Sequence, residues 1–308
     1  MKISVPATPV IPKGPCRPVI GFGLFVLALN IGFWSPLLDL ARFAARSDLY
    51  SHVLLLPFIS LYLAASKRKV LPRRWAGNTA AAWIPAMAGA LALSSCWIIN
   101  LLQWKLSRND CLAITVFAWF CFLCAGFLFF FGFSLMRVLA FPLGFLIFMV
   151  PLPAFFANWL ETFLQHASAE AAAALFNLSG SSVYRDGLIF RLPGLTIEVA
   201  RECSGLHSTL VLFLTSLLAG HLLLTRGWRK VLLALAVVPV AILRNGFRIF
   251  TLSYLSVHVD PRVIDSPLHH QGGPIFFALS LIPFFALLLW LRKSENRRGR
   301  PRPGNSIN

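Results

Sequence analysis

The chain has 308 residues, of which 57% are hydrophobic and only 13% are charged. Its mean hydropathy of +0.73 excludes an ordinary soluble domain, in which about a quarter of the residues are charged. The net charge of +17 would favour nucleic-acid binding in a soluble protein, so the distribution of the charges has to decide what they mean.

Apolar stretches recur along the chain at the length, about 20 residues, at which an α-helix crosses the hydrocarbon core of a bilayer. Backbone polar groups in lipid must be satisfied within their own segment, so each stretch is expected to be a helix. We therefore expect an all-α polytopic membrane protein with about eight transmembrane helices. They are expected at residues 19–38, 50–65, 79–101, 111–132, 138–157, 205–224, 231–251 and 274–291.

The basic residues gather in alternate connecting segments. If the N-terminus lies inside, the inner segments hold 18 of the 28 Lys and Arg residues and a single acidic residue, Glu295. The outer segments, with the outer end of the seventh span, hold the other 10 basic residues and 10 of the 11 acidic ones. This positive-inside distribution predicts that both termini are cytoplasmic, and it accounts for the basic charge without nucleic acid.

These boundaries predict three parts. Residues 1–18 are expected to form a cytoplasmic tail, residues 19–291 an integral membrane domain, and residues 292–308 a basic cytoplasmic tail.

An outer segment, residues 158–203, separates the fifth and sixth expected spans. From Trp159 to Leu178 apolar residues recur at helical spacing, which predicts an interfacial helix on the outer membrane surface. Its polar face is expected to carry Glu161, Gln165, His166 and Glu170. Residues 187–199 read as two short strands around a Pro193-Gly194 turn, so a small β-hairpin is expected next.

Six cysteines occur, at positions 16, 96, 111, 121, 124 and 203. Most lie in or at the edges of apolar spans, where cysteine packs as a small hydrophobe. The C-x-x-C of Cys121 and Cys124 has no partner pair, so no metal site is expected there. Only Cys203 lies beside a polar, outward-facing segment, and we therefore expect no structural disulfide.

Three polar groups are expected to meet on the outer face. Cys203 stands at the start of the sixth span, Asn245 to Arg248 near the outer end of the seventh, and His269 to Gly273 before the eighth. Each has an ordinary explanation alone: packing, an arginine reaching toward the interface, or a loop histidine. An ionisable group inside a span is nevertheless costly, which marks Arg248 as a functional candidate, and Arg244 lies one turn deeper on the same face.

A thiol, an imidazole and a guanidinium together support acyl transfer. Nearby cations favour the thiolate, which is the reactive form of a cysteine. A histidine can protonate the leaving amine, and a guanidinium can stabilise the tetrahedral oxyanion. The joint pattern therefore predicts a cysteine nucleophile at the membrane surface.

At these positions the chain resembles the exosortase/archaeosortase family. The resemblance rests on Glu202-Cys203-Ser204-Gly205 at the start of a span, the N-x-x-R of Asn245 to Arg248, and the H-x-x-x-G of His269 to Gly273. It implies a membrane cysteine transpeptidase of the PEP-CTERM sorting type in the cytoplasmic membrane of a bacterium or archaeon. Its catalytic residues would be Cys203 as nucleophile, Arg248 as oxyanion or thiolate stabiliser and His269 as acid and base.

The resemblance also implies partners. Such enzymes cleave exported proteins whose C-terminal signal combines a short Pro-containing motif, a transmembrane helix and a basic end. They are thought to transfer the new C-terminus to a cell-envelope acceptor outside the membrane. No cofactor, metal ion or nucleic acid is expected, and membrane lipid surrounds the spans.

Several alternatives remain open at this point. His270 or His207 could replace His269 as the base, although the four-residue offset to Gly273 favours His269. A lipid-linked glycan polymerase or ligase would also use outer arginines, but it would not need Cys203. A small-solute transporter would need polar residues near the bilayer midplane, and Asn30 and the prolines of the fifth span are the only support for it.

Overall fold

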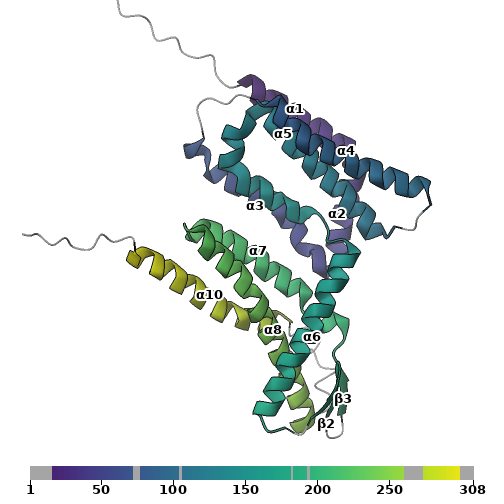
Figure 1. Cartoon of the computed structure of the whole chain (residues 1–308), viewed down its shortest axis with the longest axis vertical. Coiled ribbons are helices and arrows are strands. Elements are labelled where there is room, and N and C mark those ends of the chain that lie inside the picture. Colours follow the sequence, from purple (N-terminus) through teal and green to yellow (C-terminus); the bar gives the residue numbers. More distant parts are fainter. Residues whose placement is uncertain are drawn as a thin grey trace, which may run out of the picture. The chain divides into compact units, whose positions relative to one another are not determined.

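A computed structural model describes residues 16–71, 77–103, 106–181, 183–192, 195–259 and 273–298. The chain divides into two compact units, Met1–Pro153 and Ala154–Asn308, each described here by itself (Figure 1). Both are built mainly of helices, as the sequence predicts. In the described part, six helices are long and apolar enough to cross a membrane, or seven if the bent pair at the start counts as one.

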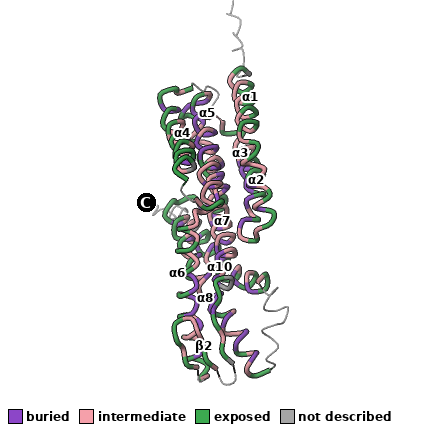
Figure 2. Tube along the Cα trace, turned by 90° about the vertical axis from the view of Figure 1, so that its right-hand side faces the viewer, coloured by how far each residue is buried: buried purple, intermediate pink, exposed green. Residues whose placement is uncertain are grey.

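The first unit is organised around one long helix, α5. In chain order its elements are α1 (Cys16–Gly32), α2 (Trp34–Arg46), the 3-10 helix η1 (Asp48–Leu55), α3 (Leu56–Ser66), η2 (Arg68–Val70), α4 (Thr79–Leu101), α5 (Arg108–Phe145) and η3 (Leu146–Met149). Helix α4 packs along the first part of α5, and α3 packs on its later part, where Ser60 Oγ donates to the carbonyl of Pro142 at 2.7 Å. As a result α5 is the more buried helix and α4 the more exposed one (Figure 2).

Three expected spans differ in shape from the prediction. The first does not run straight from 19 to 38, because the chain bends by 71° between α1 and α2. Helix α2 is amphipathic, and it buries Leu40 and Ala44 while Asp39 and Arg42 stay exposed enough to pair. The fourth and fifth expected spans form one helical stretch, Arg108–Met149, of 42 residues.

Gly132 interrupts that stretch. Forty-two helical residues would measure about 63 Å, roughly twice the thickness of a bilayer core. Gly132 has φ 69°, a left-handed value that glycine tolerates and that no helix continues through. The break coincides with the end of the fourth expected span, so it divides the stretch where hydropathy predicted a boundary.

The second unit combines three apolar helices with a small α/β part. Its elements are α6 (Ala154–Leu178), β1 (Tyr184–Asp186), β2 (Ile189–Leu192), β3 (Leu195–Glu198), η4 (Arg201–Ser204), α7 (Leu206–Leu223), α8 (Gly227–His258) and α10 (Gly273–Arg298). Helices α7, α8 and α10 share a core of buried leucines and Phe284. This bundle uses the first part of α8, and the later part of α8 packs on α6.

The expected β-hairpin is confirmed and gains a strand. Strands β2 and β3 pair antiparallel, with Phe190 opposite Ile197, and β1 adds to the other edge of β2. Phe190 is fully buried against Phe176 of α6, and Ile249 of α8 belongs to the same core. The sheet therefore closes over the end of α8, which runs to His258 instead of ending at 251.

Helix α6 buries a different face from the one its apolar pattern predicts. Gln165, expected on the polar face, is buried, and its amide donates to the carbonyl of Val199. The rest of the buried face is mainly small: Ser168, Ala169 and Ala172. Small residues occupy the buried face because they let another helix come close, whereas the large side chains of Phe163 and Leu178 remain exposed.

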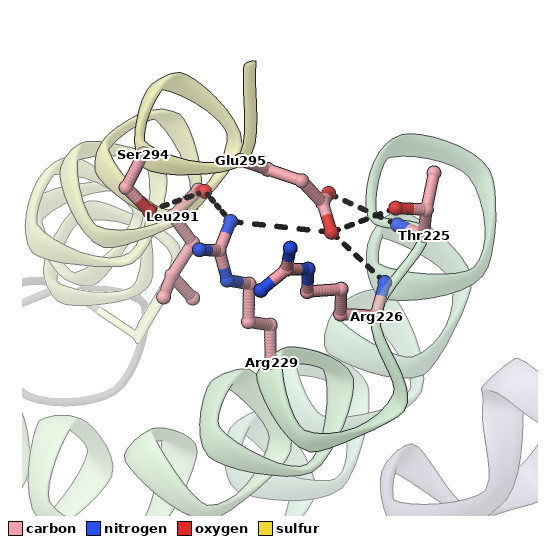
Figure 3. A network of polar contacts seen from close by, with 6 residues as sticks. All are labelled: Thr225, Arg226, Arg229, Leu291, Ser294 and Glu295. Carbon is pink, nitrogen blue, oxygen red and sulfur yellow. Dashed lines mark hydrogen bonds and ion pairs between the residues drawn. The ribbon is translucent and has the colours of Figure 1, made fainter. Parts of the chain in front are cut away.

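A polar network joins the far end of α10 to the turn between α7 and α8 (Figure 3). The carboxylate of Glu295 accepts from the backbone amides of Thr225 and Arg226, at 3.0 and 2.9 Å, and from Thr225 Oγ1 at 2.7 Å. Arg229, only 2% exposed, donates to the carbonyl of Leu291 at 2.9 Å and lies 3.9 Å from Glu295. Glu295 thereby caps the start of α8, which explains why α10 continues past the expected end of the span at 291.

Candidate functional site

The candidate site is built around the turn that carries Cys203. The chain leaves β3, passes through the short helix η4 (Arg201–Ser204), and enters α7 after Gly205. Two bonds to Val199 fix this approach: its amide donates to the carbonyl of Leu188 at 3.0 Å, and its own carbonyl accepts from Gln165. The backbone of Cys203 is thus held between the sheet and α7, while its side chain lies outside the described part of the structure.

Gly205 is the pivot of this turn. It has φ 73°, in the left-handed region, where a residue with a Cβ is strained. A Cβ added to it would also come within 2.7 Å of Arg244 Nη2 and within 3.3 Å of the side chain of Asn245. Both the backbone conformation and the close approach of α8 therefore require glycine at this position.

The carbonyl of Gly205 collects four donors. The amide and the hydroxyl of Thr209 donate to it at 3.0 and 2.8 Å, Ser208 Oγ at 3.0 Å, and Arg244 Nη2 at 3.3 Å. Three of these come from the first turn of α7, and the fourth crosses from α8. The arginine bond ties the residues that follow Cys203 directly to the Asn245–Arg248 motif.

Arg244 is nearly buried, with 8% of its surface exposed. Within the described residues it forms no ion pair, and its Nη1 is buried without a hydrogen-bond partner. Burying a guanidinium away from a carboxylate is costly. From the sequence alone Arg244 was placed only as a residue one turn deeper than Arg248, although two arginines four residues apart in an apolar helix are a visible signal.

Arg248 lies one helical turn beyond Arg244 and is half-buried. Residues four apart face the same side of a helix, so α8 presents two positive charges along one face. The start of that face contacts the Cys203 turn through Arg244. The structure thus brings the Cys203 turn and the N-x-x-R motif together within the second unit.

Gly246 positions this face against α6. A Cβ at Gly246 would come within 2.6 Å of the Cβ of Ala171 and within 3.0 Å of the backbone amide of Ala172. Backbone atoms cannot move aside cheaply, so only glycine permits this crossing. The close crossing therefore fixes the position and rotation of α8 against α6, and with them the positions of the neighbouring Arg244 and Asn245.

Of the three candidate histidines, only His207 lies in the part of the chain that the structure describes. His269 and His270 lie outside the described residues. His207 lies in the first turn of α7 and is partly buried, and its Nδ1 is buried without a hydrogen-bond partner in the described part. The structure therefore leaves the choice of base as the sequence analysis left it.

No metal centre accompanies these groups in the part of the chain that the structure describes: no cluster of three or more His, Cys, Asp or Glu residues occurs there. Cys121 and Cys124 are free thiols buried in α5, in the first unit. They lie among apolar side chains, as the sequence predicts.

The model of one protein family, described as transmembrane exosortase, matches residues 34–286. The chain belongs to the transmembrane exosortase family. The match spans all the motif residues on which the resemblance was based, from Cys203 to Gly273. Comparison with curated proteins and with solved structures finds no match for this exosortase.

Proposed function

We propose that this exosortase is a membrane cysteine transpeptidase that processes exported proteins at the outer face of the cytoplasmic membrane. Its substrates would carry a C-terminal motif, a transmembrane helix and a basic end. The observation that carries the proposal is the bond from Arg244 to Gly205, because it joins the turn of Cys203, the cysteine beside the polar outer segment, to a doubly cationic helix face.

In the proposed reaction the thiolate of Cys203 attacks the scissile carbonyl carbon. Negative charge then develops on the carbonyl oxygen, where the guanidinium of Arg248 would stabilise it. When the C–N bond breaks, His269 gives a proton to the leaving amine and a thioester remains on Cys203. A nucleophile from the cell-envelope acceptor then attacks the thioester and loses its proton to the histidine, and the C–S bond breaks to release the thiolate of Cys203.

Arg244 has a separate role in this proposal. Its Nη2 donates to the backbone beside the nucleophile, so it acts as a positioning residue that holds the Cys203 turn. Its charge, which no carboxylate of the described residues pairs, also raises the local positive potential, which favours thiolate over thiol.

A substitution series tests the nucleophile. Cys203→Ser and Cys203→Ala should abolish processing of a co-expressed exported protein tagged ahead of its sorting motif. Cys121→Ser is the matched control, because it removes a thiol buried in α5 and should process normally. The readout is the mobility shift of the tagged protein, with the amount of membrane-inserted enzyme measured in parallel.

Normal maturation by Cys203→Ala would refute the proposal and favour an enzyme that does not need the thiol, such as a lipid-linked glycan polymerase. In the same assay His269→Ala, His270→Ala and His207→Ala identify the base. The variant that loses processing while the other two retain it marks the catalytic histidine, and we expect it to be His269.

A further inference from the structure

Two cysteines meet at one end of the hairpin formed by α4 and α5. The Sγ atoms of Cys96, near the end of α4, and Cys111, in the first part of α5, are 3.0 Å apart, across 15 positions of sequence. Both are free thiols; Cys96 is buried and Cys111 is partly exposed. A disulfide requires the sulfurs to be about 1 Å closer, which is a small adjustment.

The charges at the two ends of α4 indicate which side of the membrane these cysteines face. Before α4, residues 67–74 carry five basic residues and no acidic one. After it, residues 102–110 carry Lys105, Arg108 and the acidic Asp110. The positive-inside rule places the first segment in the cytoplasm and the second outside. Cys96 and Cys111 lie at the second end, toward the compartment in which disulfides persist.

We propose that Cys96 and Cys111 form a disulfide that closes the outer end of the α4–α5 hairpin. This departs from the sequence-based expectation of no disulfide, because spacing along the chain could not reveal the sulfur–sulfur contact. The proposal does not rest on the proposed function, since neither residue belongs to the candidate site.

The bond would form by thiol–disulfide exchange with a disulfide-bearing oxidoreductase outside the cytoplasm. Cys111, the more exposed thiol, attacks the oxidant's S–S bond and forms a mixed disulfide. Cys96 then displaces the oxidant, so that one S–S bond forms in the hairpin as the oxidant's bond breaks. The oxidant leaves as a dithiol with the two electrons and two protons.

Cys121 and Cys124 provide an internal comparison. They follow Cys111 by 10 and 13 residues in α5, roughly 15 and 20 Å deeper along the helix. Both are buried free thiols among apolar side chains. They should stay reduced in the same molecule under the same conditions.

Counting free thiols in the full-length protein tests the proposal. Cells are quenched with acid, and the denatured protein is labelled with a polymer-linked maleimide either directly or after reduction. With six cysteines, the unsubstituted chain should carry four labels before reduction and six after. Cys121→Ser should keep the difference of two, with three and five labels.

Cys96→Ser and Cys111→Ser should each carry five labels both with and without reduction. Six labels on the unsubstituted chain before reduction would overturn the proposal. So would loss of the two-label difference in Cys121→Ser, or a reducible dimer in place of an internally bonded monomer. The assay measures no processing, so its outcome is separate from that of the Cys203 series.

Discussion

Two arginines of α8 are almost fully buried, but they have different partners. Arg229 lies 3.9 Å from the carboxylate of Glu295 and donates to the carbonyl of Leu291. Arg244 donates to the carbonyl of Gly205, and in the described residues it has no carboxylate partner. Arg229 is therefore neutralised by a described carboxylate, whereas the charge of Arg244 has no such partner among the described residues and, under the proposed function, would be available to negative charge that arises during the reaction.

The comparison teaches that burial alone does not separate a structural arginine from a functional one. In the sequence Arg229 stands beside Lys230 before the seventh expected span, and Arg244 stands within that span four residues before Arg248, so neither position reveals a partner. The identity of the partner distinguishes them, so removing Arg229 should mainly affect stability and removing Arg244 should mainly affect activity.

The largest expected effect follows from Arg229→Met. The substitution leaves Glu295 without its cation and breaks the bond to α10, which should lower the free energy of unfolding by about 3 kcal/mol. Thermal unfolding in detergent measures it, and processing per folded molecule should be unchanged. If the double variant Arg229→Met with Glu295→Gln were no more stable than Arg229→Met alone, the buried charge would not be the cause.

Arg244→Met should reverse this pattern. Without the bond to Gly205 the Cys203 turn is expected to shift. A shift of about 1 Å lowers the processing rate roughly 100-fold, which equals a rise of about 2.7 kcal/mol in the activation free energy. Stability should be equal or higher, because the substitution removes a buried charge that has no carboxylate partner among the described residues. Arg244→Lys retains the charge but not the planar fork and should recover only part of the rate. If the processing rate of Arg244→Met were within about threefold of that of the unsubstituted enzyme, Arg244 would not be a positioning residue.

Gly205→Ala should have an intermediate effect. The left-handed φ costs about 1–2 kcal/mol, and the new Cβ pushes the guanidinium of Arg244 from the Gly205 carbonyl. Gly180→Ala is the matched control, because Gly180 has φ 70° and open space around its Cβ position. Both variants should lose similar stability, and only Gly205→Ala should lose processing. Equal processing by the two would show that the contact with Arg244 is not needed.

The smallest effect is expected at the exposed pair of Glu170 and Arg185, whose atoms lie 2.8 Å apart. The hydrogen bond and charge of Arg185 lower the pKa of Glu170, so the pair stabilises the fold above the ordinary carboxylate pKa. That contribution is lost only as the pH falls through the lowered pKa. Glu170→Gln should therefore leave thermal stability at neutral pH unchanged within error, and a clear decrease would show that the pair is more than a surface contact.

The apolar helices and the β-hairpin could be predicted from the sequence because the hydrophobic length and the strand–turn pattern are local signals. The bend between α1 and α2 was not predicted, since residues 19–38 are apolar enough to form one straight span and the bend serves the packing of Leu40 and Ala44. The burial of Gln165 could not be predicted either, because it depends on a hydrogen bond to the carbonyl of Val199, which lies 34 residues later in the chain.

At the site, the sequence indicated that the Cys203 region and Asn245–Arg248 would meet. The contact itself runs through Gly205 and Arg244, and although the sequence marks both residues, it does not show that they bond to each other. The close crossing at Gly246 likewise depends on small residues of α6 that are distant in the chain. The roles of Cys203, Arg248 and His269 remain predictions that the substitution series tests.

The cap that Glu295 provides has a consequence for the order of membrane insertion. The carboxylate lies 70 residues after Thr225, whose amide it binds. At synthesis rates of 5–20 residues per second, the α7–α8 turn emerges roughly 4 to 14 s before its cap. During that interval the start of α8 and the buried Arg229 have no counter-ion from α10. We therefore expect the α7–α8 hairpin to be least stable during that interval, and translation of α10 supplies the missing carboxylate.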